Sequence, residues 1–198
     1  MSQGPRSPCP QDMRVRTVES IPMPGRATIG LYNSYDPVRF HEAHRRALAR
    51  AGPLALAFDC NLATFGFPFD KELSTPLEVA RWVSTTTSIG EDGGYLVELS
   101  EKGRFASFDL PSKGFPPQLG EVVATTRRPA KGKSVSPEDV RSAMASGRSV
   151  LLLFGLGPRG LPKDVLATAR KHLDITMRGM SLETCTALGA VVGSLMGR

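Results

Sequence analysis

The sequence predicts an α/β fold in which a mostly parallel sheet carries helices on both faces. Apolar segments of strand length alternate with amphipathic segments of helical length along most of the chain, as is typical of βαβ units. Several apolar segments are nearly uninterrupted, most clearly 150–154, as expected for strands covered on both faces. We therefore expect one α/β domain over residues 27–198, preceded by an N-terminal arm, 1–26, that contains five prolines and little apolar pattern.

The first part of the domain predicts a strand, a helix and a second strand. The short apolar segment 27–32 is the first strand. The polar turn 33–37 contains Asn, Ser and Asp, which can cap a following helix at 38–51. A Gly-Pro pair ends that helix in the prediction, and the almost wholly apolar segment 54–60 is interpreted as the second strand. This order begins a parallel sheet.

The middle of the chain predicts shorter elements. Residues 75–84 have the pattern of a short helix, and 95–99 and 104–110 are interpreted as two strands. Residues 111–119 are too rich in proline and glycine for regular structure. The apolar segment 122–126 predicts a further strand.

The C-terminal part begins with a basic loop at 127–133. Ser136 then has the properties of an N-cap, because proline follows it at the first helical position and Asp139 stands three residues later. That helix should end near Gly147. The remaining predicted elements are a strand at 150–154, a helix at 162–169, a strand at 172–176 and a last helix, capped by Ser181, that runs to about Met196.

Composition and charge narrow the classes of function. Hydrophobic residues make up 40% of the 198 residues and charged residues 22%, which is typical of a globular protein. No apolar segment approaches the roughly 18 residues of a membrane span, and the three cysteines form no CxxC motif. We therefore expect a cytoplasmic protein without disulfides and without a membrane partner. The net charge is +6, and residues 120–198 carry twelve basic and six acidic side chains. Such a surface attracts RNA phosphates or is simply solvated.

The clearest motif is the GxGxxG string at 155–160, between a predicted strand and a predicted helix. Glycines there let a ligand approach the backbone, and a helix N-terminus offers free N–H groups to an anion. Asp174 follows Gly155 by 19 residues, near the spacing of a ribose-binding acid in dinucleotide folds. Only about 40 residues follow the motif, however, which is too few for a mononucleotide-binding half, and Pro158 stiffens the turn. A tight structural turn is the alternative.

Three loops are expected to meet at one edge of the sheet. They follow the strands that end near 126, 154 and 176, and the last of them is the segment 177–184. Ligands of parallel sheets bind at the carboxyl ends of the strands. The sequence therefore predicts one crevice, formed by three loops, for a small anionic or nucleotide-like ligand.

The same segments carry a resemblance to a known class of proteins. The strings FGLGPRGLP, HLDIT and RGMSLET, in this order and before an apolar terminal helix, resemble the C-terminal half of SPOUT-class (α/β knot) RNA methyltransferases. The strings GLYNSYDP at 30–37 and GFPPQLGEVVATT at 114–126 resemble an uncharacterised archaeal family grouped with that class. This resemblance implies a trefoil knot within about 117–198, S-adenosylmethionine as cofactor, an RNA substrate and a homodimer.

By this resemblance, nine residues of the three loops would bind the cofactor: Thr125, Thr126, Gly155, Leu156, Gly157, Gly160, Ile175, Ser181 and Leu182. Guanidinium groups grip phosphate in two places, so Arg127, Arg128 and Arg159 are the candidates for holding RNA phosphates. The resemblance assigns no catalytic residue. The candidates for catalysis are Asn33, Asp36 and Arg127, although Asn33 and Asp36 have the alternative role of a helix cap.

Two other functions stay open at this point. The same fold can act as a non-catalytic RNA-binding or scaffold protein, and the GxGxxG string leaves an NAD-binding oxidoreductase as a further alternative. We expect no metal, although His41 and His44 share a helix face and could join Asp59 or Cys60.

Two further segments each have two interpretations. Cys185 lies in an apolar helix and is interpreted as a small core residue rather than a nucleophile. Phe115, in the proline-rich loop 113–117, could stack on an RNA base or brace a crossover connection.

Overall fold

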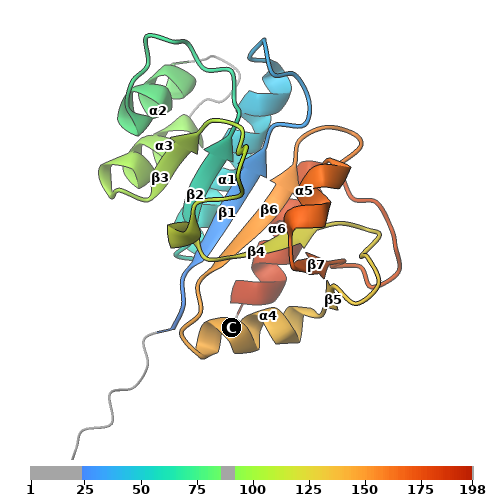
Figure 1. Ribbon diagram of the computed structural model, residues 1–198. Coiled ribbons are helices and arrows are strands. Elements are labelled where there is room, and N and C mark those ends of the chain that lie inside the picture. The colour runs from blue at the N-terminus through green and yellow to red at the C-terminus, as the bar shows by residue number, and fades with distance from the viewer. Residues whose placement is uncertain (1–23, 86–91, 198) are drawn as a thin grey trace, which may run out of the picture.

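A seven-stranded parallel sheet forms the centre of the molecule. The computed structural model describes residues 24–85 and 92–197, so most of the predicted arm lies outside the described residues (Figure 1). The strands lie in the order β3-β2-β1-β6-β4-β7-β5, and every neighbouring pair is parallel. The strands are β1 (Ala27–Tyr32), β2 (Asn61–Phe65), β3 (Phe105–Phe108), β4 (Glu121–Thr125), β5 (Ser134–Val135), β6 (Val150–Gly155) and β7 (Lys171–Leu173). The predicted parallel α/β sheet is confirmed.

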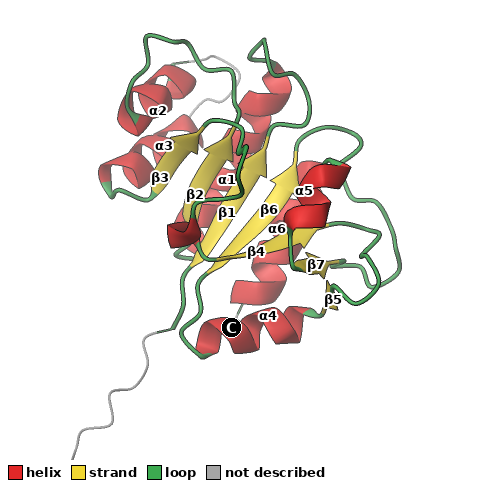
Figure 2. Cartoon of the chain, viewed as in Figure 1, coloured by secondary structure: helices red, strands yellow, loops and turns green. Residues whose placement is uncertain are grey.

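Helices cover both faces of this sheet, as predicted. Figure 1 shows α1 and α6 behind the sheet and α5 in front of it. The helices are α1 (Glu42–Ala57), α2 (Pro76–Ser84), α3 (Asp92–Glu101), α4 (Pro137–Ala145), α5 (Lys163–Thr168) and α6 (Thr184–Met196), and a 3-10 turn covers Pro117–Leu119. Figure 2 shows how the loops connect these helices to the strands.

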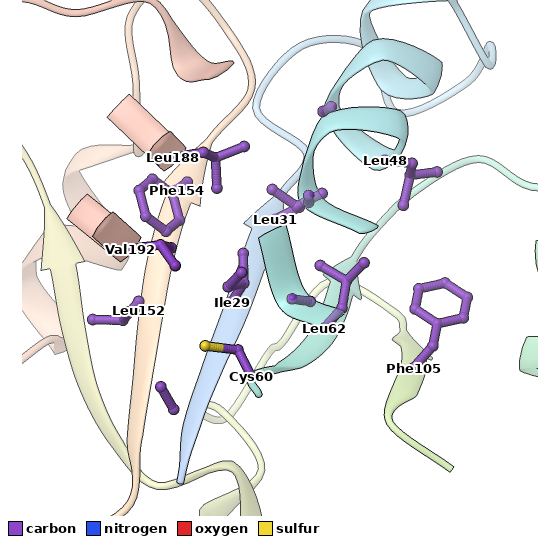
Figure 3. Packing of buried hydrophobic residues seen from close by; sticks show 14 of the residues in the cluster. Ile29, Leu31, Leu48, Cys60, Leu62, Phe105, Leu152, Phe154, Leu188 and Val192 are labelled. Carbon is purple, nitrogen blue, oxygen red and sulfur yellow. The ribbon is translucent and has the colours of Figure 1, made fainter. Parts of the chain in front are cut away.

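The alternating side chains of β6 divide the core into two layers. Leu152 and Phe154 pack in the cluster that contains α1, α2, α3 and α6, and Leu151 and Leu153 pack in the cluster that contains α5. In Figure 3, Leu152 and Phe154 lie toward the side chains of α6, among them Leu188. All four side chains of β6 are at most 1% exposed, and burial of each stabilises the fold by about 1.5–3 kcal/mol.

The segment 54–60, predicted as a strand, is mostly the end of α1. The helix continues through Pro53 to Ala57, and the strand begins only at Asn61. An uninterrupted apolar segment suits a buried helix as well as a buried strand. Here the prediction was wrong, because burial of Ala51 and Ala55 in the core outweighs the hydrogen bond that proline cannot donate.

The segment 95–99 is also helical, within α3, and not a strand. Leu96 and Leu99 are three residues apart and both buried, which puts them on one helical face. That face packs between α1 and α2. These tertiary contacts decide the structure against the β-propensity of the segment.

Smaller differences concern the C-terminal part. The strand predicted at 172–176 ends at Leu173, and the short strand β5 was not predicted. Glu183 caps α6 in place of Ser181, because its Oε2 accepts hydrogen bonds from the N–H groups of Cys185 and Thr186. The predicted N-cap Ser136 is confirmed, including the reciprocal bonds with Asp139.

The residues of the metal alternative lie apart in the structure. His41 lies at the N-terminal end of α1, whereas Asp59 and Cys60 follow its C-terminal end. Within 24–85 and 92–197, no group of three or more His, Cys, Asp or Glu side chains could hold a metal ion. None of the helices in this part of the chain combines the length and the apolar composition that a membrane span needs.

Candidate functional site

A cavity of about 730 Å³ lies at the carboxyl ends of β4, β6 and β7. Four segments provide most of its lining: 125–127, 154–161, 173–175 and 180–184. All nine residues predicted from the sequence as cofactor-binding line it: Thr125, Thr126, Gly155, Leu156, Gly157, Gly160, Ile175, Ser181 and Leu182. The three loops expected to meet at one edge of the sheet therefore do meet there.

The glycine-rich loop is a tight turn whose shape its own glycines require. A Cβ on Gly155 would lie 2.4 Å from the carbonyl carbon of Gly160. Gly160 has a φ of 70°, which side-chain-bearing residues rarely adopt, and its N–H donates to the carbonyl of Gly157 at 2.8 Å. The following helix, α5, has only six residues. The structural interpretation of the GxGxxG string is thus correct, although the turn also lines the cavity.

Gly157 is held against the loop that follows β1. Its N–H donates to Ser34 Oγ at 2.9 Å, and a Cβ at this position would lie 2.4 Å from the carbonyl oxygen of Ser34. The sequence suggests that glycine is needed here for a ligand to approach. In the structure, the neighbouring backbone already requires it.

Asp174 organises the third loop. Its Oδ1 accepts hydrogen bonds from the N–H and the hydroxyl of Thr176, and its Oδ2 accepts one from the N–H of Gly179 at 2.7 Å. These bonds support a turn in which Met177 has a φ of 52°. The carboxylate is therefore engaged within its own loop, in contrast to the free ribose-binding acid of the dinucleotide motif.

Side-chain hydrogen bonds also attach the loops to the sheet. Thr184 Oγ1 donates to the carbonyl of Gly155 at 3.1 Å, which ties the start of α6 to the glycine-rich loop. Thr125 Oγ1 donates to the carbonyl of Leu153 at 2.8 Å. The N–H of Thr126 donates to the carbonyl of Leu173 at 3.0 Å. The walls of the cavity are thus preorganised by bonds between segments far apart in the sequence.

The lining suits a small molecule with an apolar ring system and polar edges. Apolar side chains form much of the wall: Leu156, Leu161, Leu166, Leu173, Ile175 and Val191. The backbone N–H groups of Ile175, Ser181 and Leu182 donate to no other atom of the described chain. Free backbone donors beside an apolar wall are what a nucleoside base requires.

The three predicted phosphate ligands lie in different positions. Arg127 and Arg159 are exposed and line the cavity, whereas Arg128 is exposed but does not line it. A second cavity of about 510 Å³ shares Arg127 and Asp174 with the first, and Lys131 lines it as well. The basic loop therefore adjoins both cavities.

The loop after β1 contains the other two catalytic candidates. Asn33 is 5% exposed, and its amide donates to the carbonyls of Asp36 and Gly66, at 2.7 Å each. Asn33 Oδ1 accepts hydrogen bonds from the N–H groups of Tyr35 and Asp36 and contacts His44 Nε2 at 3.1 Å. Asn33 is thus occupied in holding this loop.

Asp36 is a hydrogen-bonded carboxylate in the same loop. Its Oδ1 accepts from the N–H groups of Val38 and Arg39, and its Oδ2 lies 2.6 Å from His41 Nε2. The bond from Val38, followed by the bond from His41, lowers the pKa of Asp36 to about 2. Asp36 stays ionised at neutral pH, and α1 itself begins only after His41.

Two exposed residues at the cavity were not singled out from the sequence, although the turn 33–37 and the loop 177–184 that contain them were. Tyr35 is 51% exposed and Met180 is 60% exposed, and both line it. The signal in the sequence was position, because Tyr35 lies in the turn after the predicted strand 27–32, at the edge where the three loops meet.

The two segments with alternative interpretations are structural. The ring of Phe115 is half-buried, 5.0 Å from the ring of Phe65 and 6.4 Å from that of Tyr32. These contacts support its role as a brace of the crossover connection. Burial raises the pKa of the Cys185 thiol to about 11, with Glu183 adding to the rise, so the thiol is a poor nucleophile at neutral pH.

Two sequence comparisons match most of the chain. The family described as "Protein of unknown function (DUF531)" matches residues 27–196. "Uncharacterized protein MJ0224" of Methanocaldococcus jannaschii is 43% identical over 166 residues, which cover 84% of this chain and 90% of that protein.

The fold is similar to solved structures of methyltransferases. A probable methyltransferase from Bordetella pertussis Tohama I has a TM-score of 0.60 and 13% identity, over 87% of this chain and 95% of that one. The TrmH/SpoU tRNA modifying enzyme of A. aeolicus has a TM-score of 0.53 and 18% identity, over 88% and 77%. An AdoMet-bound rRNA methyltransferase from Sinorhizobium meliloti has a TM-score of 0.50 and 19% identity, over 88% and 57%.

Some of these proteins are longer than the matching region. The chain spans 57% of the Sinorhizobium protein and 65% of a probable methylase family protein from Haemophilus influenzae Rd KW20. Identities below 20% establish a common fold and no more. The predicted resemblance to SPOUT-class RNA methyltransferases is confirmed at that level.

Proposed function

The chain belongs to the family described as "Protein of unknown function (DUF531)", and from this premise we propose that it is an S-adenosylmethionine-dependent RNA methyltransferase. One observation carries the proposal: the nine residues selected from the sequence line one cavity of about 730 Å³ at the carboxyl ends of three parallel strands. The likeness to the AdoMet-bound rRNA methyltransferase and to the tRNA modifying enzyme supports it at the level of fold.

The cavity residues fit the proposed cofactor. The apolar wall around Leu156 and Ile175 would contact the adenine ring, and the free N–H groups of Ser181 and Leu182 would bind its polar edge or the ribose. Arg127 or Arg159 would bind the carboxylate of the amino-acid part. Bound there, the sulfonium supplies an activated methyl group to an acceptor atom of RNA. The protein contributes mainly positioning.

RNA is the proposed substrate because the cavity opens beside exposed cations. Arg127, Arg128, Arg159 and Lys131 are all exposed, and Arg127 and Lys131 line the second cavity. Guanidinium and ammonium groups so placed would contact the phosphates that flank the modified nucleotide.

The cofactor assignment is tested by calorimetry with S-adenosylmethionine and, separately, with NAD. We expect saturable binding of the first only, since Asp174 is engaged in its own loop. The exposed cavity residue Ser181 offers the decisive variant. Ser181→Trp should fill part of the cavity and abolish binding with little change in melting temperature. Its control, Ser142→Trp, is on the exposed side of α4 and away from both cavities. A wild-type protein that binds no S-adenosylmethionine at millimolar concentration refutes the assignment.

The RNA assignment is tested by the salt dependence of binding to total RNA. Loss of one phosphate contact in Arg127→Ala should reduce the slope of log affinity against log salt by about 0.7. Arg81→Ala removes the same charge from the exposed surface of α2 and serves as control. Equal slopes for the two variants contradict the proposed contact.

A non-catalytic RNA-binding role is the second candidate function. One observation favours it: Asn33 and Asp36, two of the three catalytic candidates, are engaged in hydrogen bonds that shape their own loop. An RNA that binds tightly but acquires no methyl group from S-adenosylmethionine would favour this candidate.

The proposal also includes a cytoplasmic homodimer with a trefoil knot within about 117–198, in a domain that spans 27–198 behind the arm at 1–26. The outward side of α6 supports the dimer. Thr186 and Ala190 are exposed there, and a Cβ on Gly189 or Gly193 would meet open space, so a second subunit could approach closely. Light scattering that gives a monomer mass at micromolar concentration contradicts the dimer. A crystal structure in which α6 does not pass through a loop of the chain contradicts the knot.

A further inference from the structure

Tyr35 presents an exposed aromatic ring at the cavity. It is 51% exposed and lines the cavity together with the glycine-rich loop. Its ring stands edge-on to the rings of His41 and His44, with centroid distances of 5.5 Å and 6.0 Å. An exposed aromatic face beside a nucleoside-sized cavity is a surface on which an unstacked RNA base can stack.

The position of this ring is fixed relative to the cavity. The N–H of Tyr35 donates to the buried Asn33 Oδ1 at 3.1 Å. The preceding residue, Ser34, accepts a hydrogen bond from Gly157 N–H at 2.9 Å. The loop after β1 and the glycine-rich loop therefore form one unit. A base stacked on Tyr35 would lie at a fixed distance from a ligand in the cavity.

Beside the ring is a partly exposed Asp–His pair. His41 Nε2 and Asp36 Oδ2 are 2.6 Å apart, and their side chains are 40% and 30% exposed. Since Asp36 is ionised, the imidazole directs Nε2–H toward it, so Nδ1 is the nitrogen without a proton, and the ring lies beside the backbone of His44 in the capping box of α1. The second imidazole differs. His44 is 0% exposed, and burial lowers its pKa. Because its Nδ1 accepts the N–H of His41, its Nε2 must carry the proton that is donated to Asn33.

From these contacts we infer that the loop after β1 forms the subsite for the acceptor nucleoside of RNA, with Tyr35 as the stacking surface and His41, oriented by Asp36, as the proton acceptor. The inference rests on the proposed methyltransferase function and extends it to the second substrate. The acceptor is a nucleoside hydroxyl or ring N–H that is brought to the mouth of the cavity.

The chemical step balances with these groups. The acceptor atom forms a bond to the methyl carbon while the bond from that carbon to sulfur breaks, and the electron pair stays on sulfur. The acceptor's O–H or N–H bond breaks, and its proton passes to the imidazole of His41. The carboxylate of Asp36 stabilises the imidazolium. The titratable groups that face this imidazole are Asp36, Tyr35 and His44. Positioned general bases contribute about 10²- to 10⁴-fold to rate.

The experiment measures transfer of a tritiated methyl group from S-adenosylmethionine to total RNA from cells that lack the gene. Tyr35→Ala should raise KM for RNA about 5- to 150-fold, the range for loss of one stacked base, and Tyr35→Phe should restore it. The affinity for S-adenosylmethionine should stay unchanged in both. Val38→Ala is the matched control, because Val38 is in the same loop, is 79% exposed and does not line the cavity. It should behave as the wild type.

His41→Gln tests the proton acceptor. It should lower kcat about 10²- to 10⁴-fold without changing either affinity. Asp36→Asn can still accept the N–H groups of Val38 and Arg39. This variant should therefore keep the turn, melt somewhat below the wild type because the bonds favour an ionised carboxylate, and lose part of kcat.

The outcomes separate this inference from the proposed function. An active wild type whose Tyr35→Ala variant keeps its KM, or whose His41→Gln variant keeps kcat, overturns the corresponding part of the subsite. A wild type that transfers no methyl group to this RNA overturns the proposed function and the role of His41 with it. In that case, RNA affinity measured by filter binding still tests whether Tyr35 is a stacking surface. Unchanged RNA affinity in Tyr35→Ala refutes it, and a loss of affinity that Tyr35→Phe restores supports it.

Discussion

Substitution of Gly157 by alanine should destabilise the protein even without a ligand. The new Cβ would lie 2.4 Å from the carbonyl oxygen and 3.0 Å from the carbonyl carbon of Ser34. Both atoms belong to the backbone, so no side-chain rotation relieves the contact. One of the two loops must move, and the hydrogen bond from Gly157 N–H to Ser34 Oγ will weaken as it does.

The expected cost follows from these two contributions. Overpacking of a close contact costs about 1–3 kcal/mol, and loss of one hydrogen bond adds about 0.5–1.5 kcal/mol. The total of about 1.5–4.5 kcal/mol corresponds to a decrease in melting temperature of about 3–18 °C for a domain of this size. Because Gly157 and Tyr35 line the same cavity, the affinity for S-adenosylmethionine should also weaken.

The assay is thermal denaturation of wild type and variant without ligand, followed by calorimetry with S-adenosylmethionine. Gly94→Ala is the control, since Gly94 lies within α3 and a Cβ there meets open space. It should stabilise the protein by about 0.5–1 kcal/mol. A Gly157→Ala variant that melts within about 1 °C of the wild type but no longer binds the cofactor refutes this reasoning. That result would mean that the ligand, and not Ser34, requires the glycine.

Three further predictions concern stability, reactivity and assembly. Leu152→Ala removes a side chain that is 0% exposed in the central strand β6, so the free energy of unfolding measured in urea should fall by about 2–5 kcal/mol. A loss below about 1 kcal/mol would contradict the described core. Burial raises the pKa of Cys60 and of Cys185 to about 11 each, so mass spectrometry should find both thiols slow to alkylate near neutral pH and faster as the pH rises toward that value. Both should react fast in the urea-unfolded chain, and rapid labelling of the folded protein at neutral pH would contradict the raised pKa values. Replacing Gly189 and Gly193 by alanine should stabilise a monomer by about 1–2 kcal/mol through helix propensity. A homodimer that packs closely on α6 should instead dissociate, which light scattering would detect as a monomer mass, and an intact dimer would exclude this interface.

Much of the fold could be predicted because local signals and tertiary structure agree over long parts of the chain. The apolar segment 150–154 is a central strand, and Ser136 begins a helix with the reciprocal bonds that its sequence pattern predicts. The nine predicted cavity residues could be found for a similar reason. They follow the ends of three strands, and parallel strands bring such positions to one edge.

The misassigned segments show where local signals are insufficient. Residues 54–57 and 95–99 are helical, although their composition suits buried strands equally well. A segment that is buried on several sides has the same uninterrupted apolar sequence whether it forms a helix or a strand. Which one forms depends on neighbours that are distant in sequence, here the packing of α1, α2 and α3 on one another.

The sequence by itself determined the parallel α/β class, the N-cap at Ser136 and the three loops of the cavity, because each depends on residue spacing within one segment. Only the tertiary structure decided that Gly157 packs on Ser34 across 123 positions, that Asp36 orients His41, and that Tyr35 lies exposed at the cavity. Such contacts join loops through the sheet rather than along the chain. No periodicity within a segment predicts these contacts, because each side chain meets its partner only after the strands have paired.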